Sequence, residues 1–355
     1  MSGKVVVNAR PGAVQEVLDF APDDEAPKTI GSAFYRGPDC NFLPYQSDHQ
    51  SERFAEKFLL RGWTPPSRFI AKGARITAFG SCFAQHITDH FREIGFSISS
   101  DQDSEIYVSR IGEGMVNVHA LLQQFEWAFE DVRPPENLWH GFKAETFGYD
   151  EDVRRRTRDV FLASDVFILT LGLSEVWYDA QTGGVLWRAV PLRHYDEARH
   201  RFRVLSFAET KTVLQRILAL ITQHAPRAAV VLTLSPVPLA ATFRPISCLT
   251  ANAASKALLR GAVDEVLREG GERPAAGVFY FPAYEAVNAL FPQPFLEDGR
   301  HFHPAIVPAI MRLFEAHYCQ TALTVDQAEQ SLREARTACV RALADHPLYA
   351  APAAP

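Results

Sequence analysis

An apolar run that ends in glycine and serine, and passes at once into a helical pattern, constrains this chain more than any other segment. Residues 76–79 are typical of a strand, Gly80 and Ser81 follow, and residues 84–94 are typical of a helix. Because glycine permits a sharp turn, Ser81 should lie where the helix offers unpaired N–H groups and its positive dipole end. A hydroxyl there can attack a carbonyl, and the N–H groups can hold the oxyanion. Serine is also a common N-cap, so this segment alone leaves both interpretations open.

A second motif lies far downstream, in the turn-like segment at residues 295–304, which contains Asp298, His301 and His303. A hydroxyl nucleophile needs a base, and the base needs a partner that fixes its tautomer and stabilises its cation. Asp298 and His301 are close enough in this loop to meet directly, and histidine suits the base role because it titrates near neutrality. The alternative is a solvated loop before a helix that starts at Pro304.

The pentapeptide GSCFA at residues 80–84 gives the chain a resemblance to a known family. The chain resembles the GSCFA family, which is similar to the SGNH/GDSL hydrolases, over residues 60–320. The segments that carry the resemblance are LTLG at 169–172, SEVW at 174–177, LTLSPVPL at 232–239 and DGRH at 298–301. It implies a catalytic triad of Ser81, Asp298 and His301. His303 is the alternative base, because the proline that is frequent in the family motif follows it. We favour His301 for its spacing from Asp298.

The resemblance also implies three donors to an oxyanion. They are the N–H of Ser81, a glycine after the second strand, and a side chain in a Gly-x-Asn-Asp element. For the glycine we favour Gly114 over Gly112. The third element reads GLSE at residues 172–175, so Ser174 stands in place of the asparagine and would donate from a shorter arm.

Several other residues compete for roles at the site. Cys82 is an alternative nucleophile, because a thiol at a helix N-terminus can ionise readily. Tentative substrate contacts are Glu175, Trp177, Asn252 and His303. Asn252 shares one face of a predicted helix with Ser255, Lys256 and Arg260, and we interpret that face mainly as solvated.

Composition excludes some classes of function. The 36 basic and 42 acidic residues give a net charge of −6, which argues against nucleic-acid binding. No segment approaches the roughly 20 apolar residues of a membrane span, and the first residues lack a signal-peptide pattern. We therefore expect a cytoplasmic protein. Its five cysteines show no Cys-x-x-Cys spacing, so we expect reduced thiols and no metal. Hydrolysis by a serine nucleophile needs no organic cofactor, so we expect none.

Strand and helix patterns alternate from residue 74 onward, which predicts a three-layer α/β/α fold with a central parallel sheet, SGNH/flavodoxin-like. The expected strands are 76–79, 96–99, 165–171, 228–234 and 278–281. The expected helices are 84–94, 115–129, 209–224, 251–269, 305–318 and 325–342.

We predict three regions along the chain. Residues 1–70 form an irregular N-terminal arm with a short helix at 51–60, residues 71–320 form the catalytic domain, and residues 321–355 form a helix and a disordered tail. Insertions fall at 133–160 and 176–206. The second is expected to contain a hairpin that turns at 181–184. We expect both insertions to shape the substrate site, and the alternative is that they only decorate the surface.

These features predict a serine esterase or O-acyltransferase that works through an acyl-enzyme. The substrate would be an ester, acetyl by family analogy, of a small molecule or carbohydrate. The alternative is a non-catalytic carbohydrate-binding or assembly module with the same fold, which the replacement at Ser174 keeps open. The sequence does not indicate an oligomeric state.

Overall fold

A computed structural model describes residues 5–8, 17–20, 28–31, 41, 43–99, 103–110, 114–134, 149–270, 273 and 275–344. The chain divides into two compact units, residues 1–51 and 52–355. The first unit contains a three-stranded antiparallel sheet in the order β1-β2-β3 and a 3-10 helix at Gln46–Gln50. Its strands are β1 Val5–Asn8, β2 Val17–Phe20 and β3 Lys28–Gly31. The prediction of an irregular arm missed these strands, because four-residue strands give too short a periodicity to recognise.

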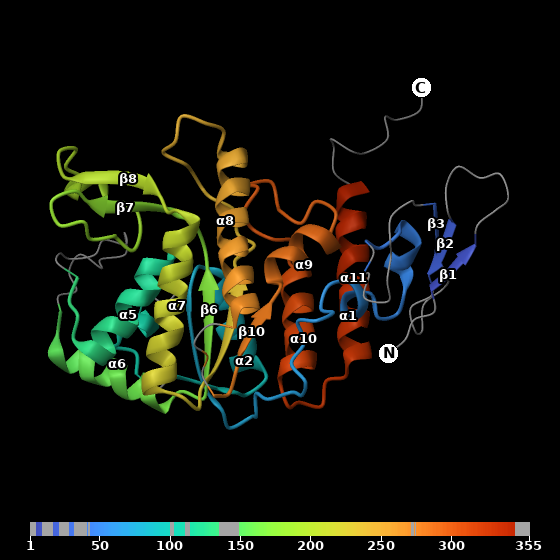
Figure 1. The fold of residues 1–355 in the computed structure, drawn as a ribbon, viewed down its shortest axis with the longest axis horizontal. Coiled ribbons are helices and arrows are strands. Elements are labelled where there is room, and N and C mark those ends of the chain that lie inside the picture. The colour runs from blue at the N-terminus through green and yellow to red at the C-terminus, as the bar shows by residue number, and fades with distance from the viewer. Residues whose placement is uncertain are drawn as a thin grey trace. The chain divides into compact units, whose positions relative to one another are not determined.

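The second unit is built on a five-stranded parallel sheet, as predicted (Figure 1). The spatial order is β10-β9-β6-β4-β5. Its strands are β4 Arg75–Gly80, β5 Ser97–Ile98, β6 Val166–Leu171, β9 Ala229–Leu234 and β10 Val278–Phe281. The first and third strands of this sheet, β4 and β6, are neighbours, so the direction of winding reverses between them. Ligands bind at the carboxyl ends of strands at such a point.

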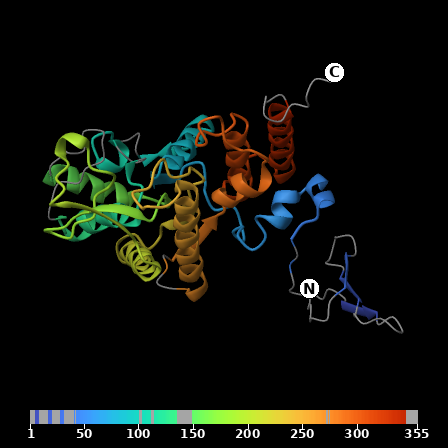
Figure 2. The same cartoon turned by 90° about the horizontal axis from the view of Figure 1, so that it is seen from above.

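Helices cover both faces of this sheet (Figures 1 and 2). Along β6 the side chains alternate: Phe167 and Leu169 enter one apolar core and Val166 and Ile168 the other. The first core is completed by α4 Tyr107–Arg110, α5 Val118–Glu130, α6 Glu151–Ala163, α7 Phe207–His224 and α8 Cys248–Glu269. The second is completed by α1 Phe54–Phe58, α2 Phe83–Glu93, α9 Ala283–Leu290, α10 Ile306–Tyr318 and α11 Val325–Ala344.

Two helices of eight or more residues were not predicted, nor was the four-residue α4. Helix α6 lies in the segment interpreted as an insertion, where its buried stripe of Val153, Thr157 and Phe161 is interrupted by three consecutive arginines. Asp150 caps this helix by accepting hydrogen bonds from two backbone N–H groups. Helix α9 is the other. The rest of that insertion, residues 135–148, and the predicted tail from residue 345 lie outside the described residues.

The hairpin predicted within 176–206 forms only in part, with the N–H groups of Asp179 and Leu186 donating to the carbonyl oxygens of Gly184 and Trp177, each at 2.9 Å. Strand β7 Glu175–Asp179 pairs antiparallel with β8 His200–Val204, and Val185 contributes only a single bridge to Tyr178. The pairing stops after Leu186, and the next residue contacts α5, where Trp187 Nε1 donates to Gln123 Oε1 at 2.8 Å. This connection, which also contains a 3-10 turn at Leu192–His194, carries residues 186–189 over the carboxyl end of the sheet. Within the described part of the chain, no helix is long and apolar enough to cross a membrane.

Candidate active site

The corner between β4 and α2 requires glycine at position 80. Its φ is +138°, and a Cβ there would lie 2.1 Å from the carbonyl oxygen of Thr170 on the adjacent strand. The next residue, Ser81, still donates its backbone N–H to that oxygen at 3.0 Å, and helix α2 begins at Phe83. The chain therefore leaves the sheet directly after Ser81, as the strand–turn–helix pattern predicted.

The hydroxyl of Ser81 is buried and unsatisfied. The residue is 4% exposed, and within the described part of the chain Oγ has no hydrogen-bond partner. Ser81 does not act as a side-chain cap for α2, whose N-cap is Cys82. Leaving a buried hydroxyl unpaired costs about 1–3 kcal/mol. A group kept at that cost in a cavity is a candidate for interaction with a ligand.

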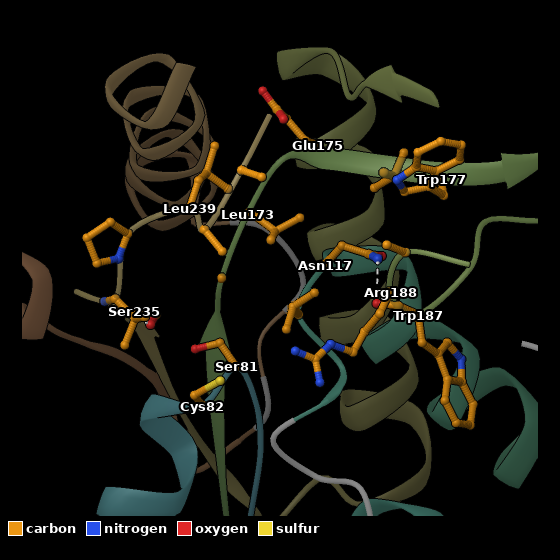
Figure 3. Close-up of a pocket in the computed structure, with 18 of the residues that line it drawn as sticks. Ser81, Cys82, Asn117, Leu173, Glu175, Trp177, Trp187, Arg188, Ser235 and Leu239 are labelled. Atoms are coloured by element: carbon orange, nitrogen blue, oxygen red, sulfur yellow. Dashed lines mark hydrogen bonds between the residues drawn. The ribbon is translucent and has the colours of Figure 1, made fainter. Parts of the chain in front are cut away.

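Ser81 lines a cavity of about 270 Å³ (Figure 3). The walls come from β7 and β8, from residues 186–189, and from the loop after β9. Most of the lining is apolar: Val116, Leu173, Val176, Trp177, Leu186, Trp187, Phe202, Val237, Pro238, Leu239 and Phe243. A small polar zone surrounded by apolar walls is typical of a small-molecule site.

Gly172, at the end of β6, packs directly against Ser81. A Cβ at position 172 would lie 3.0 Å from Ser81 Cβ and 2.6 Å from the carbonyl oxygen of Val116. That same oxygen accepts the N–H groups of Gly172 and Leu173 at 3.1 and 3.0 Å. The sequence placed Gly172 at the end of a strand but missed this contact. The LTLG pattern was the only signal for it.

The buried Lys256 of α8 is hydrogen-bonded to the loop that contains Gly172. Its Nζ donates to the carbonyl oxygens of Gly172 and Ser235, each at 2.7 Å, and the residue is 1% exposed. Burial lowers the pKa of Lys256 to about 7. The prediction of a solvated helix face is thus wrong for Lys256 and for Ser255, which are both buried. Asn252, on the same helix, accepts the N–H of Leu239 at 3.0 Å.

The Asp298–His301 pair forms as predicted. His301 Nδ1 bonds to the Asp298 carboxylate, which also accepts the N–H groups of His301 and Arg300, each at 3.0 Å. These backbone and ring hydrogen bonds lower the pKa of Asp298 to about 2. His303 does not bond to Asp298. Its Nδ1 accepts a hydrogen bond from the N–H of Ala305 at 3.3 Å, just before α10.

Ser81 and His301 line adjoining hollows. The cavity of Ser81 and the groove of His301 share four lining residues: Cys82, Arg188, Val237 and Arg300. The His301 side chain is 80% exposed, and no hydrogen bond joins it to Ser81 in the described residues. The nucleophile candidate and the acid–base pair are therefore placed at the same edge of the sheet, without a hydrogen bond between them.

Comparison with known protein families finds a match over most of the second unit. The sequence model of the GSCFA family matches residues 75–314, from the start of β4 to within α10. The chain belongs to the GSCFA family. A search of curated proteins finds no match. Ser81 and Cys82 are the serine and cysteine of the GSCFA pentapeptide, and the Asp298–His301 pair also falls inside the matched region.

In this GSCFA protein the three expected oxyanion donors do not gather around Ser81 Oγ. The N–H of Ser81 is bonded to Thr170. Ser174 is fully buried, with its N–H and hydroxyl on Ser255 Oγ at 2.8 and 3.1 Å. Neither Ser174 nor Gly114 lines the cavity. At the N-terminus of α2 the N–H groups of Ala84 and Gln85 donate to the carbonyl oxygens of Ser81 and Cys82, which leaves the N–H groups of Cys82 and Phe83 as candidate donors to an oxyanion.

Of the tentative substrate contacts, Glu175 and Trp177 line the cavity of the GSCFA domain. Glu175 is 7% exposed, and its carboxylate accepts a hydrogen bond from the hydroxyl of Thr242. The Nε1 of Trp177 is buried and has no partner among the described residues. Asn252 lies instead in another hollow beside the Asp298 loop, and His303 lines both that hollow and the groove of His301.

Proposed function

We propose that this GSCFA protein is a serine esterase or O-acyltransferase. The observation that carries the proposal is the unpaired, buried hydroxyl of Ser81 in an apolar cavity that adjoins an Asp–His pair. Ser81 Oγ attacks the ester carbonyl, and His301 accepts the hydroxyl proton. Asp298 orients the imidazole and stabilises its cation, a role supported by a pKa of about 2 that keeps the carboxylate ionised at neutral pH.

The reaction then follows acyl-transfer chemistry. The tetrahedral oxyanion is stabilised by N–H groups at the N-terminus of α2, and its collapse expels the alcohol, which takes the proton from His301. A water molecule or an acceptor hydroxyl attacks the acyl-enzyme, with His301 again removing the proton. Contact between Ser81 and His301 has to form when substrate binds, and catalytic hydrogen bonds are often loose in unliganded enzymes. The exposed ring of His301 has the freedom to make that approach.

Active-site labelling tests the nucleophile. We expect a fluorophosphonate to modify the intact protein once, with the adduct on Ser81 by peptide mass spectrometry. Ser81→Ala should abolish labelling, while the matched variant Cys82→Ala should label normally. An adduct elsewhere, or no adduct while the protein is folded by circular dichroism, would count against the proposal.

A non-catalytic carbohydrate-binding module is the second candidate. It is favoured by the aromatic wall of the cavity, where Trp177 packs edge-on against Phe243 with ring centroids 4.7 Å apart. Calorimetry with a panel of glycans separates the two candidates. Binding that is unchanged in Ser81→Ala, together with no turnover of any ester, would favour the binding module.

A further inference from the structure

Two arginines line both the cavity of the proposed nucleophile and the groove of its proposed base. They are Arg188, from the connection between β7 and β8, and Arg300, from the Asp298–His301 loop. In Figure 3 the guanidinium of Arg188 extends into the cavity on the side of Ser81. Any molecule that reaches from Ser81 toward His301 therefore passes these two cations.

The guanidinium of Arg300 has unused bonding capacity. Its Nε is buried without a hydrogen-bond partner, and Arg300 makes no ion pair among the described residues. The nearest acid in sequence, Asp298, is already bonded by the ring of His301 and by two backbone N–H groups. A buried, unpaired donor on a permanent cation is unfavourable unless a ligand supplies an acceptor.

Of the three acidic residues that line these hollows, Glu175 and Asp89 are bound to other partners, and none of the three is among the four residues that the hollows share. In the cavity, Glu175 accepts the hydroxyl of Thr242 and lies at the end remote from Ser81 (Figure 3). In the groove, Asp89 of α2 bonds to Gln85 and Arg92, each at 2.7 Å. The junction is thus a local positive site in a protein whose net charge is −6.

Apart from Glu175, the part of the cavity beyond the two arginines is lined mainly by apolar side chains. The whole cavity, at about 270 Å³, leaves room for an acyl group longer than acetyl. Burying several methylene groups against Val176, Leu186 and Phe202 would be favourable. This part of the cavity therefore suits an apolar acyl chain or ring.

The direction of the substrate follows from the proposed chemistry. The carbonyl carbon must lie at Ser81 Oγ, and the leaving alcohol must face His301, which protonates it. The acyl group then points into the apolar cavity, and the alcohol portion lies at the arginine junction. Guanidinium groups bind carboxylate and phosphate through paired hydrogen bonds.

We infer that the substrate joins an apolar acyl group to an alcohol that carries an anionic group, carboxylate or phosphate, bound by Arg188 and Arg300. The assignment of the ester rests on the proposed function. The anion site does not, because it rests on the lining residues and the unpaired donor of Arg300.

Binding of compounds that contain no carboxylic ester tests the anion site alone. We would titrate the full-length protein with 4-hexyloxybenzoate, 4-hexyloxyphenyl phosphate and uncharged 4-hexyloxybenzamide in a calorimeter. At least one anion should bind about tenfold or more tightly than the amide, as expected for charge-assisted hydrogen bonds. The stronger of the two anions identifies the headgroup.

Variants locate the site. Arg300→Gln should remove the preference for the anion while leaving amide affinity within about threefold, and Arg300→Lys should restore part of it, since it keeps the charge but loses the planar fork. Arg341→Gln, at an exposed position of α11, is the matched control. Equal affinity for anions and amide in the unmodified protein, or a preference that survives in Arg300→Gln, would overturn the inference.

Turnover separates this inference from the proposed function. With 4-(hexanoyloxy)benzoate and neutral phenyl hexanoate, Arg300→Gln should lower kcat/KM about tenfold for the anionic ester only. Anion preference in binding without hydrolysis of either ester would defeat the enzyme proposal and leave the anion site standing. Hydrolysis of both esters with no anion preference would defeat the anion site and leave the enzyme proposal standing. An equal loss for both esters would mean that Arg300 acts on the reacting centre and not on an anion.

Discussion

The Nζ of Lys256 lies 2.7 Å from the carbonyl oxygen of Gly172, the residue that packs against Ser81. The same Nζ bonds to Ser235, so one buried side chain joins the loops that follow β6 and β9 at the floor of the cavity. Both bonds survive deprotonation, because a neutral amine still has two N–H donors. The charge of Lys256 is therefore not needed for this link, and burial opposes it.

We predict that Lys256 makes stability depend on pH. Its pKa falls from 10.5 to about 7 on folding, so between these values the unfolded chain binds one more proton than the folded protein. The free energy of unfolding should then rise with pH, by about 1.4 kcal/mol per unit, and should not change through this group below pH 7. Urea unfolding gives the free energy of unfolding of each protein. The value for the unmodified protein minus the value for Lys256→Met should be about 2 kcal/mol larger at pH 9 than at pH 7.

The exposed position Lys72 provides the control for that comparison, as Lys72→Met. A difference between the unmodified protein and Lys256→Met that stays constant from pH 7 to pH 9 would mean that the buried lysine remains charged.

We predict that Ser81→Ala lowers kcat on short p-nitrophenyl esters by about a thousandfold or more, as removal of a triad nucleophile does. Cys82→Ala should keep activity within a few-fold, although Cys82 lines the same cavity. Initial rates on purified, folded variants measure both effects. Activity of Ser81→Ala within tenfold of the unmodified protein would transfer the nucleophile role to Cys82 or elsewhere.

We predict that replacing His301 lowers activity, whereas replacing His303 mainly lowers stability. His301→Ala removes the partner of Asp298 and should lower kcat about a thousandfold. His303→Ala removes an acceptor for the Ala305 N–H and should mainly cost stability, about 0.5–1.5 kcal/mol by urea unfolding. Abolished turnover in His303→Ala, with normal turnover in His301→Ala, would reverse the assignment of the base.

The parts of the fold that the sequence predicted are those fixed by local patterns. Buried runs such as β6 and β9, and the glycine before Ser81, leave few alternatives. The pairing of β7 with β8 could not be predicted in the same way, because the partner strand lies beyond a long connection and competes with a nearer segment around Val185.

The sequence predicted the Asp298–His301 side-chain pair correctly, but it did not predict the backbone hydrogen bonds around Ser81. The sequence paired Asp298 with His301 because their spacing in one loop is enough to bring them together. It could not show that the N–H of Ser81 bonds to Thr170, since that depends on the register of β4 against β6. It also assigned Lys256 to solvent, because lysine is rarely fully buried.

The contact between Gly172 and Ser81 gives the last prediction. Gly172→Ala places a Cβ 2.6 Å from a backbone carbonyl oxygen of Val116 and 3.0 Å from Ser81 Cβ, and neither can move freely. We expect a loss of about 1–3 kcal/mol in the free energy of unfolding, as for other overpacked positions, and a fall in kcat because the loop and Ser81 must separate. The matched control is Gly73→Ala, where no atom lies within 4 Å of the added Cβ; it should change stability by less than about 0.5 kcal/mol. If Gly172→Ala matched this control in both urea unfolding and esterase rate, close packing against Ser81 would not be what requires glycine at the end of β6.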